Sequence, residues 1–272
     1  MYKNRAVSVP YLLWAVLFIV VPLGLVLYFA LTTRQGAFTL DNLSRVGEYS
    51  SVIMSSIWLS VIATAICLLI SYPLAFIMSR STGNTQRTFM MLIMLPMWMN
   101  FLLRTYAWMT ILEKNGLINQ LLGKFGLGPL QMINTPGAVV LGMIYNYLPY
   151  MILPLYSTMI KIEKHLIEAA QDLGANTWVV LWRVVVPLSM PGITTGITMV
   201  FVPCISTFAI SRMLGGGSSM LIGDLIELQF LGNTYNPNLG AAISLVLMVI
   251  ILICMALMNM FDESEDKEAM LL

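Results

Sequence analysis

The sequence predicts an all-α, polytopic membrane protein with about six transmembrane helices. Of its 272 residues, 58% are hydrophobic and only 10% are charged, whereas about 25% of the residues of a soluble domain are charged. A helix that crosses a bilayer needs about 20 apolar residues. Six stretches have this character, and they cover roughly residues 11–31, 53–79, 88–112, 138–160, 193–214 and 240–261. With six spans, the two termini lie on the same side of the membrane.

The first apolar stretch, Tyr11–Leu31, follows Lys3 and Arg5. It is longer than the apolar core of a cleavable signal peptide, so we expect it to be retained as the first span. The predicted organisation is a cytoplasmic N-terminus at 1–10, a transmembrane domain at 11–261 and an acidic cytoplasmic tail at 262–272.

Basic residues indicate the orientation, because loops that stay in the cytoplasm are rich in lysine and arginine. The side of the termini has eight: Lys3, Arg5, Arg80, Arg87, Lys161, Lys164, Arg183 and Lys267. The other side has five: Arg34, Arg45, Lys114, Lys124 and Arg212. This difference predicts that both termini are cytoplasmic. The net charge of +1 gives no reason to expect a nucleic-acid partner.

Arg104 lies within the third apolar stretch. A charged side chain at that depth is costly unless it is paired or reaches the interface. Either Arg104 pairs with a carboxylate, such as Glu227 or Glu113, or its long side chain extends to the outer interface.

The residues that catalysis or metal binding would require are missing. Cys67, Cys204 and Cys254 are isolated in apolar runs, and His165 is the only histidine, so no metal site is expected. The glycine cluster Gly215–Gly217 lacks the lysine of a phosphate-binding loop. We therefore expect neither an enzyme nor a nucleotide site in this chain.

The segment 161–192 is amphipathic, unlike its uniformly apolar neighbours. A short helix over Glu163–Leu173 is expected to end at Gly174, because glycine accepts the left-handed conformation at a helix end. Asn176 or Thr177 then caps a second helix, which Pro187 is expected to stop. One interpretation is a helix lying on the membrane surface; the other is a docking element whose small residues enter a groove on another protein.

The docking interpretation is favoured by a specific resemblance. Glu168-Ala169-Ala170, Gly174-Ala175 and Val186-Pro187 match the EAA signature of ABC importer permeases, in the loop before the penultimate span. The resemblance implies a type I, MetI-like permease fold in which 161–192, here named the coupling segment, docks on a separate ATPase subunit. ATP and Mg would be bound there, with no cofactor in this chain.

Several stretches resemble the permeases of spermidine/putrescine importers, in particular the B-type subunit. They include Leu95–Asn100, Arg104–Tyr106, Leu148–Met151, Pro154–Tyr156 and Ile222–Phe230. The implied partners are a second permease, a dimer of ATP-binding subunits, an extracytoplasmic polyamine-binding protein and membrane lipid. Related permeases transport sulfate, ferric iron or thiamine, so the solute stays open. An ATP-independent carrier is a further alternative, although such carriers often show an internal repeat that is not evident here.

A polyamine pathway needs carboxylates or aromatic faces to replace the water around an ammonium group. Asp224 and Glu227 are three residues apart, which places both carboxylates on one face of a helix. They either attract the substrate or pair with Arg212 or Arg104. Trp98 and Tyr150 are the aromatic candidates for the pathway, although aromatic residues also gather at membrane interfaces.

Overall fold

A computed structural model describes residues 5–217, 219–232 and 235–269. This part of the chain is helical and contains no sheet, which confirms the all-α prediction. Five helices are long and apolar enough to cross a membrane, and a bent pair of helices makes a sixth when it is counted as one span. The five are Val9–Ala30, Asp41–Arg80, Pro136–Met159, Thr177–Ser206 and Pro237–Met258.

The first span is one continuous helical rod. α1 (Arg5–Ala15) passes through a π-helical turn, Val16–Val20, into α2 (Val21–Ala30). A short loop leads to α3 (Asp41–Val46), which continues through a single 3-10 turn, Gly47–Tyr49, into the long α4. The second span is α4 itself (Ser50–Arg80), whose buried face carries alanine and serine side chains that allow close helix packing.

The third apolar stretch, 88–112, forms a bent pair of helices that counts as one span only if the two are taken together. α5 (Gly83–Met94) and the following 3-10 turn (Leu95–Trp98) are separated from α6 (Phe101–Leu112) by a bend of 90°. Asn100 starts the second helix of the pair. Its side-chain oxygen accepts a hydrogen bond from the amide of Leu102 at 2.9 Å and thereby caps α6. The short helix α7 (Leu117–Lys124) follows α6 in the chain.

The fourth span, α8 (Pro136–Met159), leads into the coupling segment, which contains α9 (Lys164–Asp172) and α10 (Thr177–Val180). Pro187 does not stop the second helix as predicted. α10 runs through a π-helical turn, in which the amide of Val186 donates to the carbonyl of Leu181, directly into α11 (Val186–Ser206). The fifth span therefore begins inside the predicted coupling segment.

The chain then forms two short helices, α12 (Ala209–Gly215) and α13 (Ile222–Leu231), before the last span α14 (Pro237–Ala269). α14 includes most of the predicted acidic tail at 262–272, whose side chains lie outside the described residues. The same holds for Lys3 and for the first residues of the predicted N-terminal segment.

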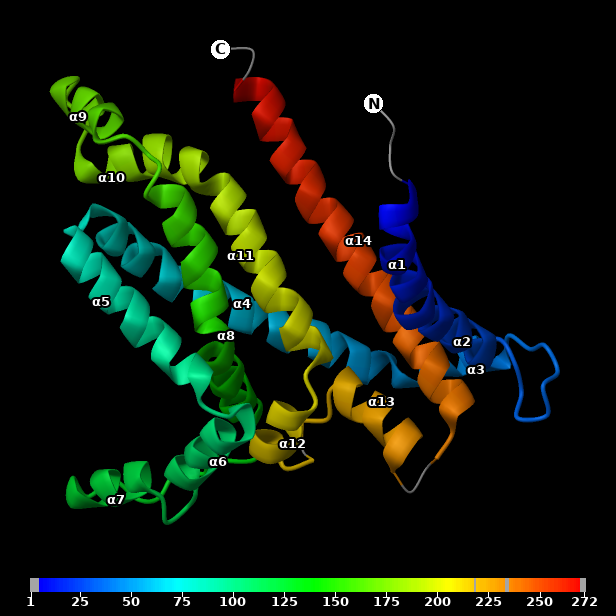
Figure 1. The fold of residues 1–272 in the computed structure, drawn as a ribbon. Helices are drawn as coiled ribbons and strands as arrows, with labels where there is room; N and C mark the ends of the chain where they lie inside the picture. The colour runs from blue at the N-terminus through cyan, green and yellow to red at the C-terminus, as the bar shows by residue number, and fades with distance from the viewer. Residues whose placement is uncertain (1–4, 218, 233–234, 270–272) are drawn as a thin grey trace.

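Figure 1 shows that the start of α1, the end of α14 and the pair α9–α10 lie at one end of the molecule, at the top of the view. The other end carries α6, α7, α12 and α13. We call these the coupling end and the outer end. The main hydrophobic core lies between α4, α8 and α11, and includes Cys67, Met151 and Val200.

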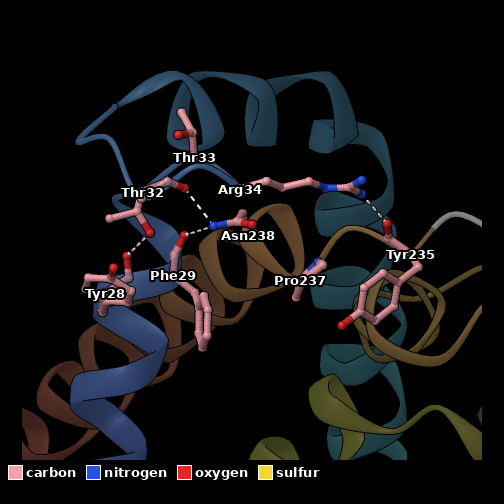
Figure 2. A pocket seen from close by; sticks show the side chains of 9 residues that line it. Tyr28, Phe29, Thr32, Thr33, Arg34, Tyr235, Pro237 and Asn238 are labelled. Atoms are coloured by element: carbon pink, nitrogen blue, oxygen red, sulfur yellow. Dashed lines mark hydrogen bonds between the residues drawn. The ribbon is translucent and has the colours of Figure 1, made fainter.

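A second core joins the first and last spans around Ala30, Leu239 and Ile243. At the outer end, the buried side chain of Asn238 donates to the carbonyls of Phe29, at 3.1 Å, and Thr32, at 2.7 Å. Figure 2 shows these bonds beside a cavity of about 290 Å³. The first span is thereby fastened to the last one.

Candidate functional site

The coupling segment has the helix, glycine turn and helix that the sequence predicts. Gly174 has φ +84°, and its amide donates to the carbonyl of Gln171 at 2.8 Å, while the amide of Ala175 donates to the carbonyl of Ala170 at 3.1 Å. These two bonds form a Schellman motif, which ends α9. Of the two predicted caps, Asn176 is the one observed, with its side-chain oxygen accepting the amide of Val179 at 2.9 Å.

One face of this element is anchored and the other is open. Ile167, Ala170 and Ala175 pack against the main core. Four large apolar side chains face outward instead, with exposed fractions of 48% for Leu166, 90% for Leu173, 68% for Trp178 and 64% for Trp182. An apolar surface of this kind, at the end of a membrane domain, is typical of an interaction site.

The EAA residues are divided between the two faces, because Ala170 and Ala175 pack on the core while Glu168 and Ala169 lie on the open side. Glu168 and Ala169 are exposed, and the Glu168 carboxylate is 3.4 Å from the exposed ring of His165. A Cβ added at Gly174 would meet no atom within 4 Å, so only its backbone conformation requires glycine. Pro187 is exposed within the continuous helix that leads to α11.

At the outer end, Asp224 is buried in the first turn of α13. Its Oδ2 accepts the amide of Leu221 at 3.0 Å, and its Oδ1 is buried without a hydrogen-bond partner. Burial raises the pKa of this carboxyl group, and the nearby Ser211 hydroxyl, the Leu221 amide and the Arg212 cation oppose the shift. Asp224 therefore stabilises the start of a helix and keeps one oxygen unpaired.

Glu227 forms an ion pair with Arg212 of α12, at 2.8 Å between Oε1 and Nη1. This is one of the two partners that the sequence allows. The second carboxylate oxygen, Oε2, is buried and accepts no hydrogen bond. Asp224 and Glu227, both on the short α13, thus each retain one unpartnered oxygen.

Arg104 is 8% exposed and pairs with neither carboxylate that the sequence suggested among the described residues. Its guanidinium group lies 5.9 Å from the ring centre of Tyr145, and its Nε and Nη1 are buried without hydrogen-bond partners. An aromatic face thus takes the place of a carboxylate beside this cation.

The two aromatic candidates are both accessible but they do not form a ring contact with each other. Trp98 is 83% exposed at the bend after α5, and Tyr150 is 40% exposed on α8. Tyr150 lies beside Tyr147, with ring centres 6.4 Å apart.

Tyr147 lines a cavity of about 460 Å³ at the outer end, between α6, α8 and the junction of α11 with α12. Sequence reasoning missed Phe101, Thr207 and Phe208 in its wall. The signal for Phe101 was the capping Asn100 directly before it. Thr207 and Phe208 lie where the helix breaks within an apolar stretch, and hydropathy does not detect such a break.

The family described as binding-protein-dependent transport system inner membrane component matches residues 71–266. The chain belongs to this family. As an inner membrane component of this kind, it is a part of a transport system and not an enzyme. The matched range covers the coupling segment and both short outer helices.

This inner membrane component is 38% identical over 247 residues to the spermidine/putrescine transport system permease protein PotB of Haemophilus influenzae, covering 87% of this chain and 86% of the relative. The protein of the same name from Escherichia coli strain K12 is 36% identical, and the match covers 87% of this chain and 90% of that protein. The E. coli inner membrane ABC transporter permease protein YdcU is 29% identical, and the match covers 75% of this chain and 69% of that protein.

Among solved structures, the inner membrane component is similar to a bacterial ABC transporter that imports the acidic polysaccharide alginate. The TM-score is 0.77 at 17% identity, with 95% of this chain and 94% of that chain covered. A second structure is of an alginate ABC transporter in complex with a pentasaccharide-bound periplasmic protein. Its TM-score is 0.79 at 16% identity, and the match covers 93% of this chain and 91% of that chain. The likeness confirms the ABC importer permease fold.

Proposed function

We propose that this chain is the B-type permease subunit of an ATP-driven importer that moves spermidine and putrescine across the cytoplasmic membrane by alternating access. The observation that carries the proposal is the coupling segment. Its Schellman turn at Gly174 holds two helices with one face on the core and an apolar face open. Such a rigid, exposed element suits docking of a separate subunit.

The proposed partners are a second permease, a dimer of ATP-binding subunits and an extracytoplasmic polyamine-binding protein. ATP and Mg are bound and used by the ATP-binding subunits. Because these subunits work in the cytoplasm, docking on α9 and α10 assigns the coupling end to the cytoplasmic side. Both termini are then cytoplasmic, since α1 starts and α14 ends at that same end (Figure 1).

Polyamines are proposed as substrates because relatives named for spermidine and putrescine share 36% to 38% of their residues with this chain over 87% of its length. The site at the outer end has suitable chemistry. Asp224 Oδ1 and Glu227 Oε2 are acceptors without partners, and an ammonium group that leaves water needs such acceptors. Trp98 and Tyr150 offer exposed aromatic faces, which also attract ammonium groups.

The proposal is tested by uptake of radiolabelled spermidine and putrescine in polyamine-requiring cells that express this chain with its partner subunits. Wild type is compared with Gly174→Asp and with the double variant Asp224→Asn/Glu227→Gln, at matched membrane levels. We expect Gly174→Asp to lose uptake while it remains in the membrane, because it adds a carboxylate beside the exposed apolar side chains of Leu173 and Trp178. We expect the double variant to lower uptake and leave binding of the ATPase subunits unchanged.

Two other outcomes would redirect the proposal. If wild type takes up no polyamine but stimulates ATP hydrolysis by its partner subunits, the substrate is another solute, such as sulfate, ferric iron or thiamine. If uptake continues when the ATPase subunits are inactivated by mutation, the chain is an ATP-independent carrier.

A further inference from the structure

Two side chains connect the turn between α4 and α5 to the coupling segment. Arg80, the last residue of α4, donates from Nη1 to the carbonyl of Ile162 at 3.1 Å. Ile162 is buried in the main core at the very start of the coupling segment. The guanidinium group also lies 5.7 Å from the ring centre of Phe76, one turn earlier in α4, which holds the side chain in place.

Gln86 of α5 makes the second connection. Its Nε2 donates to the carbonyls of Ser79, at 3.4 Å, and Ser81, at 3.0 Å, so that it spans the turn. Its Oε1 accepts the hydroxyl of Tyr156 in the last turn of α8, at 3.3 Å. Tyr156 is 9% exposed and belongs to the main core. The turn is therefore bonded to the end of α8 as well as to the residue that opens the coupling segment.

We propose that Arg80 and Gln86 are positioning residues that make the α4–α5 turn move together with the coupling segment. The inference rests on the proposed function, in which ATPase subunits move that segment. α8 and α11 receive the movement directly, because they continue from the two ends of the coupling segment. α4 and α5 are not joined directly to the coupling segment along the chain. The hydrogen bonds of Arg80 and Gln86 connect their turn to it instead.

The link contains no ion pair. Arg80 donates to a backbone carbonyl, and Gln86 bonds to uncharged groups. Nearby Arg87 is exposed and belongs to the same turn of α5. It provides a matched control, because its replacement removes an equal charge without removing the link.

The first test measures polyamine taken up per ATP hydrolysed by the complete transporter in vesicles with its binding protein. Loss of a hydrogen bond to a charged donor is expected to lower this ratio about tenfold in Arg80→Met. Arg80→Lys, which keeps one donor, is expected to fall between Arg80→Met and wild type, and Arg87→Met is expected to match wild type. If ATP hydrolysis and uptake fall in parallel, or if neither changes, the inference is wrong.

The second test does not depend on the substrate. Spin labels at two exposed positions, Asn84 in the first turn of α5 and Arg183 between α10 and α11, report the distance from the turn to the coupling segment in the assembled transporter. We expect the same distance in the nucleotide-free and vanadate-trapped states of wild type, and a changed distance in Arg80→Met. A change of several ångströms in wild type would overturn the inference. Failure of wild type to take up polyamine refutes the proposed substrate alone, since the label distance is measured without it.

Discussion

The Arg212 guanidinium and the Glu227 carboxylate, from two different short helices at the outer end, lie 2.8 Å apart. If this pair were only structural, Arg212→Gln would be at least as harmful as Glu227→Gln, because it leaves the carboxylate, whose side chain is only 20% exposed, without its partner. Because Glu227 also keeps a buried, unpartnered oxygen, we expect Glu227→Gln to reduce polyamine uptake several-fold more than Arg212→Gln. Uptake and thermal stability are measured for both variants; equal uptake in the two would assign the pair a structural role alone.

The second prediction concerns Asp224 and pH. Burial raises the pKa of this carboxyl group above its ordinary 3.8, so the folded protein holds the proton to a higher pH than the unfolded chain. Stability contributed by the protonated form is present at low pH and is lost as the pH rises through the folded-state pKa. We therefore expect Asp224→Asn to raise the melting temperature at pH 7, with a gain that shrinks toward acidic pH.

The melting temperature in detergent is measured across this pH range. Asp172→Asn, at an exposed position, serves as the control and is expected to change nothing. If Asp224→Asn raised the melting temperature equally at every pH, burial of the Asp224 charge would not be the cause of the increase.

The third prediction concerns the left-handed turn at Gly174. A Cβ added here would meet no atom within 4 Å, so the cost of substitution in this chain is mainly backbone strain, about 1–2 kcal/mol for most residues. Asparagine tolerates this conformation and a β-branched residue does not. We expect Gly174→Asn to keep most ATPase-subunit binding and Gly174→Val to lose it, as measured by co-purification from membranes. Equal loss in both would point to steric exclusion at the docked interface.

The fourth prediction concerns close packing under α13. A Cβ on Gly223 would lie 2.4 Å from the carbonyl oxygen of Thr207, whereas a Cβ on Gly24 would meet nothing within 4 Å. Because backbone atoms cannot rotate away, we expect Gly223→Ala to cost about 1–3 kcal/mol. Gly24→Ala is the matched control and is expected to leave the melting temperature unchanged or slightly higher. A fully stable Gly223→Ala protein would contradict this packing.

The coupling segment was predictable because short-range rules determine it. The structure has α9 at Lys164–Asp172, against the predicted Glu163–Leu173, and the expected roles of Gly174 and Asn176 as turn and cap are observed. Each of these features depends on residues within five positions of one another. The residues next to each of these features in the sequence are therefore enough to predict it.

Other features were not predicted, either because hydropathy and the rule that proline stops a helix do not detect them, or because they depend on distant parts of the chain. The residues on either side of the bend at Asn100 are equally apolar, so hydropathy treats 88–112 as one span. Pro187 was expected to end a helix, but a preceding π-helical turn lets the helix continue past it. The spacing of Asp224 and Glu227 correctly indicates one helix, yet their partners come from other segments of the chain, including α12.

The bonds from Asn238 to Phe29 and Thr32 join residues about two hundred positions apart in the chain. During synthesis the first span therefore enters the lipid long before the helix that holds it exists. Until α14 is made, the end of this span is held within the protein only by nearby residues such as Asn42, which donates to the carbonyls of Ala30 and Thr32. A truncated chain that ends before α14 would therefore leave the first span without its bonds to Asn238 and without the apolar side chains of Leu239 and Ile243.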